Sequence, residues 1–133
     1  MTTEFLIKSA NSASTLLLNN KSPNCFDVSI ETPGLRATKK VCIYDCGWSN
    51  GFLDFFGHIA SHSKPWAGAE TWEPIDGNIR LRATCDALGH VELKIYLMDG
   101  FASIDDWSLE CSIFVDFGML PFHAEDARRF VVL

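Results

Sequence analysis

The segment from residue 78 to residue 97 constrains the fold most, because apolar and polar residues alternate along two consecutive runs. A period of two predicts strands with one buried face and one solvent-facing face. The short connection over residues 86–89 predicts an antiparallel hairpin. The rest of the chain then has to cover the apolar face of this hairpin. That face comprises Ile79, Leu81, Ala83, Cys85, Val91, Leu93, Ile95 and Leu97.

Further strands are expected on both sides of this hairpin. Short apolar or alternating runs predict strands over residues 4–9, 15–18, 25–32 and 35–45, a strand starting within 70–73, and a last strand over 107–115. Turn formers such as Pro33 and Gly34 separate these runs. The pair Lys39 and Lys40 breaks the alternation, which suggests a bulge or an exposed strand end.

Two segments have helical spacing instead. Over residues 51–63 the apolar side chains recur every three or four positions, and the helix is expected to end before Pro65. A short helix over residues 122–131 carries a weak apolar stripe of Ala124, Ala127 and Val131. The expected fold is therefore α+β in one domain, residues 1–133. It has an antiparallel sheet of seven or eight strands in two meanders, half-barrel or sandwich-like, with one crossing helix and a short C-terminal helix.

The charge is unevenly distributed. The net charge is −6, and residues 49–133 hold six basic and thirteen acidic groups, a balance of −7. This acidity repels phosphate backbones, so no nucleic-acid partner is expected, whereas a basic protein would be attracted. Mild acidity for solubility alone is the alternative explanation.

The cysteines and the chain start bear on the cellular location. Five cysteines, an odd number, together with no recognisable export signal, suggest reduced thiols that act as small buried hydrophobes in a cytoplasmic protein. The apolar runs are too short for a membrane span. The spacing of Cys42 and Cys46 is not typical of zinc sites, so no metal or other cofactor is expected.

The histidines are the main catalytic candidates. His58 and His62 lie four residues apart on one helix face, a spacing that suits zinc. No third ligand is apparent, and the glutamate that directly follows the first histidine in zincin metalloproteases is absent. His90 is expected to bond to Asp86 in the hairpin connection. An enzyme that combines these histidines with carboxylates is thus the third-ranked hypothesis. Because no nucleophile, phosphate-loop or dinucleotide motif is present, a protein without enzymatic activity is expected.

The middle of the chain resembles a bacterial family of unknown function. The patterns that carry this resemblance are Gly51-Phe52-x-Asp54-Phe55-Phe56, Trp66-x-Gly68-x-x-x-Trp72-Glu73, and Gly77-x-Ile79-x-Leu81-x-Ala83-x-x-Asp86-x-x-Gly89-His90-Val91-x-Leu93. The resemblance covers roughly residues 51–97 and implies no catalytic residues. In size, acidity and architecture the chain also resembles immunity proteins of bacterial toxin systems, an analogy at the level of the fold.

The first hypothesis is therefore a cytoplasmic immunity-type inhibitor that docks on a basic toxin. Its expected docking residues are Trp66, Glu70, Glu73, Asp76, Asp105, Asp106 and Glu110. The second hypothesis is a small-ligand module with a pocket between helix and sheet, lined by Phe52, Phe56, Trp66 and Trp107. Trp48 and Trp66 are either loop anchors or core residues, whereas Trp72 and Trp107 are expected in the core. An exposed strand edge would also allow a homodimer.

Overall fold

The computed structural model describes residues 4–43, 51–74, 77–99 and 107–132 and contains two antiparallel sheets of four strands each. The first sheet has the order β1-β2-β3-β4, and its strands follow one another in the chain as a meander. This arrangement confirms the first predicted meander. The strands are β1 (Phe5–Lys8), β2 (Thr15–Asn19), β3 (Cys25–Thr32) and β4 (Leu35–Cys42).

The second sheet is also a meander, with the order β5-β6-β7-β8. Its centre is the predicted hairpin: Ile79 pairs with Leu97 and Cys85 with Val91 in one unbroken register. The strands are β5 (Ala69–Trp72), β6 (Ile79–Cys85), β7 (His90–Met98) and β8 (Ser108–Asp116). The fold class is thus α+β as predicted, and within the described residues the two sheets are not closed into a barrel.

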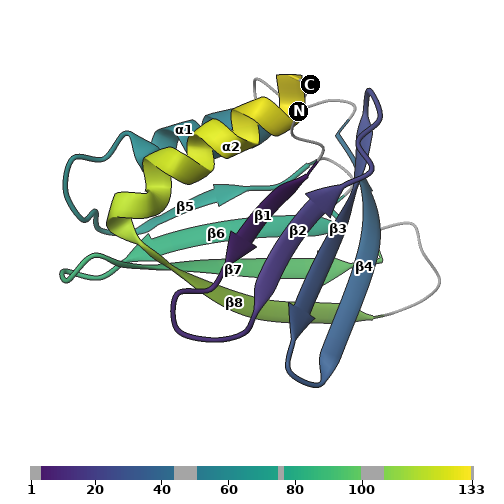
Figure 1. Cartoon of the computed structure of the whole chain (residues 1–133), viewed down its shortest axis with the longest axis horizontal. Coiled ribbons are helices and arrows are strands. Elements are labelled where there is room, and N and C mark those ends of the chain that lie inside the picture. Colours follow the sequence, from purple (N-terminus) through teal and green to yellow (C-terminus); the bar gives the residue numbers. More distant parts are fainter. Residues whose placement is uncertain (1–3, 44–50, 75–76, 100–106, 133) are drawn as a thin grey trace.

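Two helices lie side by side along the edge of the molecule where β1 and β5 run (Figure 1). Helix α1 (Leu53–Ala60) buries Phe55, Phe56 and Ile59, the helical stripe expected from the sequence. Helix α2 (Leu120–Val132) follows β8 after a short 3-10 turn. None of the helical segments that the structure describes is both long and apolar enough to cross a membrane.

An aromatic cluster joins the two sheets and the two helices. Phe52, directly before α1, has its ring centroid 6.0 Å from that of Phe5 in β1 and 5.6 Å from that of Trp72 in β5. Phe26 in β3 lies 6.5 Å from Phe130 in α2, edge to face. Such edge-on contacts bury large apolar areas in favourable geometry, so this cluster holds the layers together.

The sheets approach each other at the β1–β8 corner. The backbone N–H of Ala10 donates to the carbonyl of Phe114 at 2.7 Å, and the backbone N–H of Phe114 donates to Ser9 Oγ at 3.0 Å. On β4, Lys39 occupies an inward-facing position and pairs with Asp99 at 2.7 Å. An inward-facing charge on an edge strand discourages pairing with another chain.

Three local predictions need correction. The β3–β4 register runs one to one from Cys25–Cys42 to Thr32–Leu35, which excludes the bulge at Lys39, and Lys40 is exposed. Trp107 is 39% exposed directly before β8, with the Lys39 ammonium 5.8 Å from its ring, and is not a core residue. The predicted stripe of α2 is confirmed in part, because Ala127 is buried and Ala124 and Val131 pack against the core. The helix starts earlier than predicted, so its buried side also includes Leu120, His123 and Phe130. Trp48 lies outside the described residues.

Candidate functional site

The residues predicted to bind a partner are only partly described by the structure. Asp76, Asp105 and Asp106 lie outside the described residues. Among those described, Glu73 pairs with Arg80 at 3.0 Å, and Glu110 pairs with Lys94 at 3.2 Å. Glu73 follows β5 and Glu110 lies on β8, which are opposite edges of the second sheet. The described members thus lie on separate edges, and the acidic docking face stays a prediction.

The aromatic pocket predicted between helix and sheet is filled by packing. Phe52 and Phe56 are 1% and 2% exposed, and their ring centroids lie 5.1 Å apart. Trp66 is buried and stacks on His62, with ring centroids 4.5 Å apart. Trp107 lies away from these rings, beside Lys39. The four residues thus do not surround a common cavity, and Trp66 is no exposed anchor.

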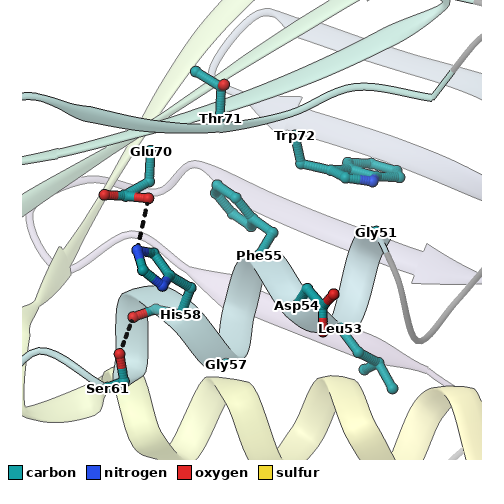
Figure 2. Close-up of a pocket in the computed structure, with 10 residues that line it drawn as sticks. All are labelled: Gly51, Leu53, Asp54, Phe55, Gly57, His58, Ser61, Glu70, Thr71 and Trp72. Carbon is teal, nitrogen blue, oxygen red and sulfur yellow. Dashed lines mark hydrogen bonds and ion pairs between the residues drawn. The ribbon is translucent and has the colours of Figure 1, made fainter. Parts of the chain in front are cut away.

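A cluster of His58, His62 and Glu70, here called the histidine–glutamate cluster, lies between the end of α1 and β5. Figure 2 shows two of its members, His58 on α1 and Glu70 on β5. Helix α1 carries His58 in its last turn, and His62 follows two residues after the helix ends. The His58 Nε2 lies 3.0 Å from Glu70 Oε2, and the His62 Nε2 lies 3.9 Å from Glu70 Oε1. Each of the three residues thus has a potential ligand atom within 4.8 Å of those of the other two.

Glu70 reaches the helix because of its phase on β5. It pairs with Ala83, which is fully buried, and it lies two residues from the buried Trp72. Side chains two apart on a strand share a face, so Glu70 points to the inner side of an edge strand, where α1 closes the core. From the sequence, Glu70 was expected to be a surface docking residue. Its alternation with Trp72 indicates that it faces inward, but not that it meets the histidines.

An open groove of about 690 Å³ adjoins the cluster. Figure 2 shows His58 and Glu70 on one side of it and Phe55 and Trp72 farther along the same helix and strand. Asp54, one turn before His58, also lines the groove. A ligand atom bound at the cluster would therefore be accessible from solvent.

A second groove, here called the β1–α2 groove, lies on the outer side of β1 against the start of α2. It has a volume of about 440 Å³ and is mainly apolar. Leu6, Met119 and Phe122 contribute to it and are 39%, 44% and 55% exposed. Leu6 alternates with the buried Phe5 and Ile7 on β1, which explains why it faces outward. The remaining lining residues are Lys8, Ala10, Val115, Asp116 and His123.

Two further titratable groups have environments that shift their pKa. His123 is 8% exposed, and burial lowers its pKa, with a smaller opposing effect from Asp126. In the hairpin connection, Asp86 Oδ1 accepts the backbone N–H groups of Leu88 and His90, both at 2.9 Å. The hydrogen bond from the His90 backbone is the main reason that the pKa of Asp86 is lowered. The predicted Asp86–His90 side-chain contact is confirmed at 3.0 Å.

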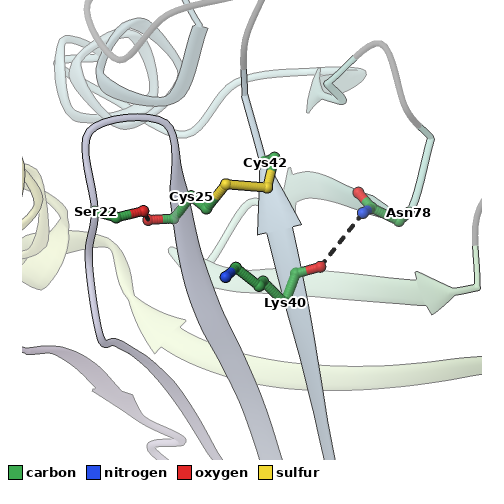
Figure 3. The surroundings of a disulfide bond; sticks show 5 residues. All are labelled: Ser22, Cys25, Lys40, Cys42 and Asn78. Atoms are coloured by element: carbon green, nitrogen blue, oxygen red, sulfur yellow. Dashed lines mark hydrogen bonds between the residues drawn. A yellow bond between two sulfur atoms is a disulfide. The ribbon is translucent and has the colours of Figure 1, made fainter.

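The cysteine prediction was wrong for one pair. Cys25, the first residue of β3, and Cys42, the last residue of β4, face each other in the register and form a disulfide (Figure 3). Cys85 and Cys111 are free thiols, as predicted, and burial raises the pKa of each. Cys46 lies outside the described residues. Because Cys25 and Cys42 form a disulfide, the cysteines no longer support the expected cytoplasmic location.

The sequence comparison agrees with the resemblance in the middle of the chain and extends it. The model of a family of unknown function, DUF6228, matches residues 7–132. The chain belongs to this family. The match begins within β1 and includes all later strands and both helices. No curated protein compared with the chain matches it.

Proposed function

We propose that this member of the DUF6228 family is a non-enzymatic binding protein that docks on a basic protein and blocks it, in the manner of an immunity-type inhibitor of a bacterial toxin. The observation that carries this proposal is the β1–α2 groove with its three exposed apolar side chains. Large exposed apolar side chains gathered at a concave site are typical of protein–protein contacts.

The groove offers anchors of the right kind. Phe122 is 55% exposed at the start of α2, and Met119 lies three residues before it. Aromatic residues and methionine are enriched at interface centres, and methionine adapts to the shape of a partner. Covering about half of each of these side chains would contribute on the order of 1 kcal/mol per residue. The groove therefore suits a partner that inserts apolar side chains.

Charge favours a basic partner. The chain carries a net charge of −6, and the excess of acidic groups lies entirely after residue 48. The groove itself is lined by one cation, Lys8, and one carboxylate, Asp116, so attraction comes from the field of the whole molecule. Such a field accelerates association and is screened by salt. The expected partner is therefore a basic protein whose association slows as ionic strength rises.

The test compares the native protein with a groove variant and a matched surface control. Phe122→Asp places a charge in the groove, whereas Leu88→Asp changes an 82% exposed apolar residue in the β6–β7 connection. Each tagged protein is used to capture partners from a lysate of its own source at low and high salt. Captured basic proteins are then produced alone, and their binding and growth inhibition are measured with and without each variant.

The proposal expects that the native chain and the Leu88→Asp chain both retain a basic protein and neutralise it. The Phe122→Asp chain should not retain this protein. An effect of about 2 kcal/mol at a central aromatic anchor corresponds to roughly 30-fold weaker binding. Retention of the same proteins by all three chains would exclude the groove as the docking surface. The inhibitor function would be excluded if the captured protein does not inhibit growth, or if the chain does not relieve that inhibition.

A further inference from the structure

We propose that the histidine–glutamate cluster is a binding site for a transition-metal dication, with Zn²⁺ the preferred ion. The site is separate from the β1–α2 groove and does not depend on the proposed inhibitor function. It combines two imidazole nitrogens with one carboxylate, a ligand set that zinc uses in proteins. The potential ligand atoms of His58, His62 and Glu70 all lie within 4.8 Å of one another.

The separations between the three groups are near those of ligands on one ion. Ligands bound to one zinc ion at about 2.0–2.1 Å lie roughly 2.8–3.4 Å apart in octahedral or tetrahedral geometry. The two separations measured from Glu70 are 3.0 Å to His58 Nε2 and 3.9 Å to His62 Nε2. The first falls in this range, and side-chain rotations that shorten the second would give both histidines a shared ion, with one carboxylate oxygen or both as the third ligand.

The His62 nitrogen provides a second, independent indication. Its Nε2 is buried and has no hydrogen-bond partner within the described structure, and the nearest carboxylate oxygen is beyond hydrogen-bond range at 3.9 Å. A buried polar nitrogen without a hydrogen-bond partner lowers the stability of the folded state, and such groups are rare in native proteins. A metal ion in the gap between His62 and Glu70 satisfies this nitrogen, whereas the His58–Glu70 ion pair alone does not.

The surrounding residues hold the ligands in place. The His62 ring lies nearly parallel to Trp66, with an interplanar angle of 16°, and Trp66 is itself buried against Phe117. Glu70 is fixed on β5 by its pairing with Ala83. His58 is held in the last turn of α1. Because these contacts already restrict the side chains of His62 and Glu70, ion binding should cost little further conformational entropy.

The fourth position of the ion faces the open groove. His58 is 58% exposed there, and the groove is lined by both His58 and Glu70. Three protein ligands with a solvent-accessible fourth position leave room for a water molecule. We therefore expect one bound ion per chain with a water ligand that small anions can displace.

The test uses tag-free protein and zinc chloride in isothermal titration calorimetry, with Co²⁺ absorption as a report on ligand geometry. The variants are His58→Gln, His62→Gln and Glu70→Gln. The matched control is His90→Gln, because His90 also pairs with a carboxylate at 3.0 Å, that of Asp86, but has no second histidine beside it. Circular dichroism confirms that each variant is folded, and His58, which is more than half exposed, is the safest substitution.

The native protein should bind one Zn²⁺ with a dissociation constant on the order of micromolar or tighter, and each cluster variant should bind about ten-fold or more weakly. The His90→Gln chain should bind as the native chain does. Binding should weaken at acid pH, since protonated imidazole cannot bind metal. Absence of saturable binding, or binding that His62→Gln and Glu70→Gln leave unchanged, would overturn the proposal. Equal loss in His90→Gln would also overturn it, because the ion would then lie elsewhere.

Discussion

Breaking the Cys25–Cys42 disulfide should destabilise the fold markedly without unfolding the hairpin that carries it. The bond closes the open end of the β3–β4 hairpin, whose other end is the turn between Thr32 and Leu35. The strand register already holds the two cysteines opposite each other, so the reduced chain can keep the same pairing. The main effect of the bond is then on the unfolded chain, which it prevents from separating these strands.

The size of the effect follows from the length of chain that the bond encloses. The two cysteines are 17 residues apart in sequence. In the chain-entropy description, closing a loop of this length stabilises the folded state by about 3 kcal/mol at 25 °C. For a domain of this size, that loss should lower the melting temperature by about 10 °C.

The assay is urea denaturation with and without a reductant. The native protein should lose about 3 kcal/mol when reduced. Cys42→Ser should be equally unstable in both conditions, whereas Cys111→Ser, which keeps the bond, should respond to reductant as the native chain does. Thiol titration of the unfolded chain should find two more thiols after reduction. Equal midpoints for the oxidised and reduced native protein would refute the expected stabilisation.

Three further predictions concern packing and titration. Phe52→Ala removes a ring that contacts both sheets, so it should lower the free energy of unfolding by about 3–5 kcal/mol, measured in urea. The pKa of His123 is lowered by burial, so the unfolded chain binds a proton more readily; stability should fall from about pH 7.5 to about pH 5.5 more steeply in the native chain than in His123→Leu. Asp86→Ala should lower the melting temperature at neutral pH, and the difference should shrink at strongly acid pH, because the pKa of Asp86 is lowered and its stabilising effect is lost as the carboxyl protonates.

The sequence predicted the strands because their burial follows a period of two. The central hairpin, the first meander and the helix that carries Phe55 and Phe56 were all located within a few residues. The start of α2 was less clear. The exposed Phe122 and the buried His123 both run against their residue type, and only packing against the core identifies the buried side of that helix.

The candidate sites were less predictable. The histidine spacing was visible in the sequence, but the third group, Glu70, lies eight residues after His62 on a separate element, β5. The β1–α2 groove joins Leu6 to Phe122, which are more than a hundred residues apart. Neither combination can be found from local periodicity, because each depends on which faces of distant elements meet.

The order of the elements, the buried faces of most strands, the acidic balance and the turn chemistry around Asp86 follow from the amino-acid sequence alone. These properties depend on neighbours within a few positions along the chain. The tertiary structure decided which strands lie at the edges, that Cys25 faces Cys42, and that Glu70 meets two histidines. Strand register and helix placement are set by the packing of the shared core, which sums contacts between distant segments and leaves no periodic mark in the sequence.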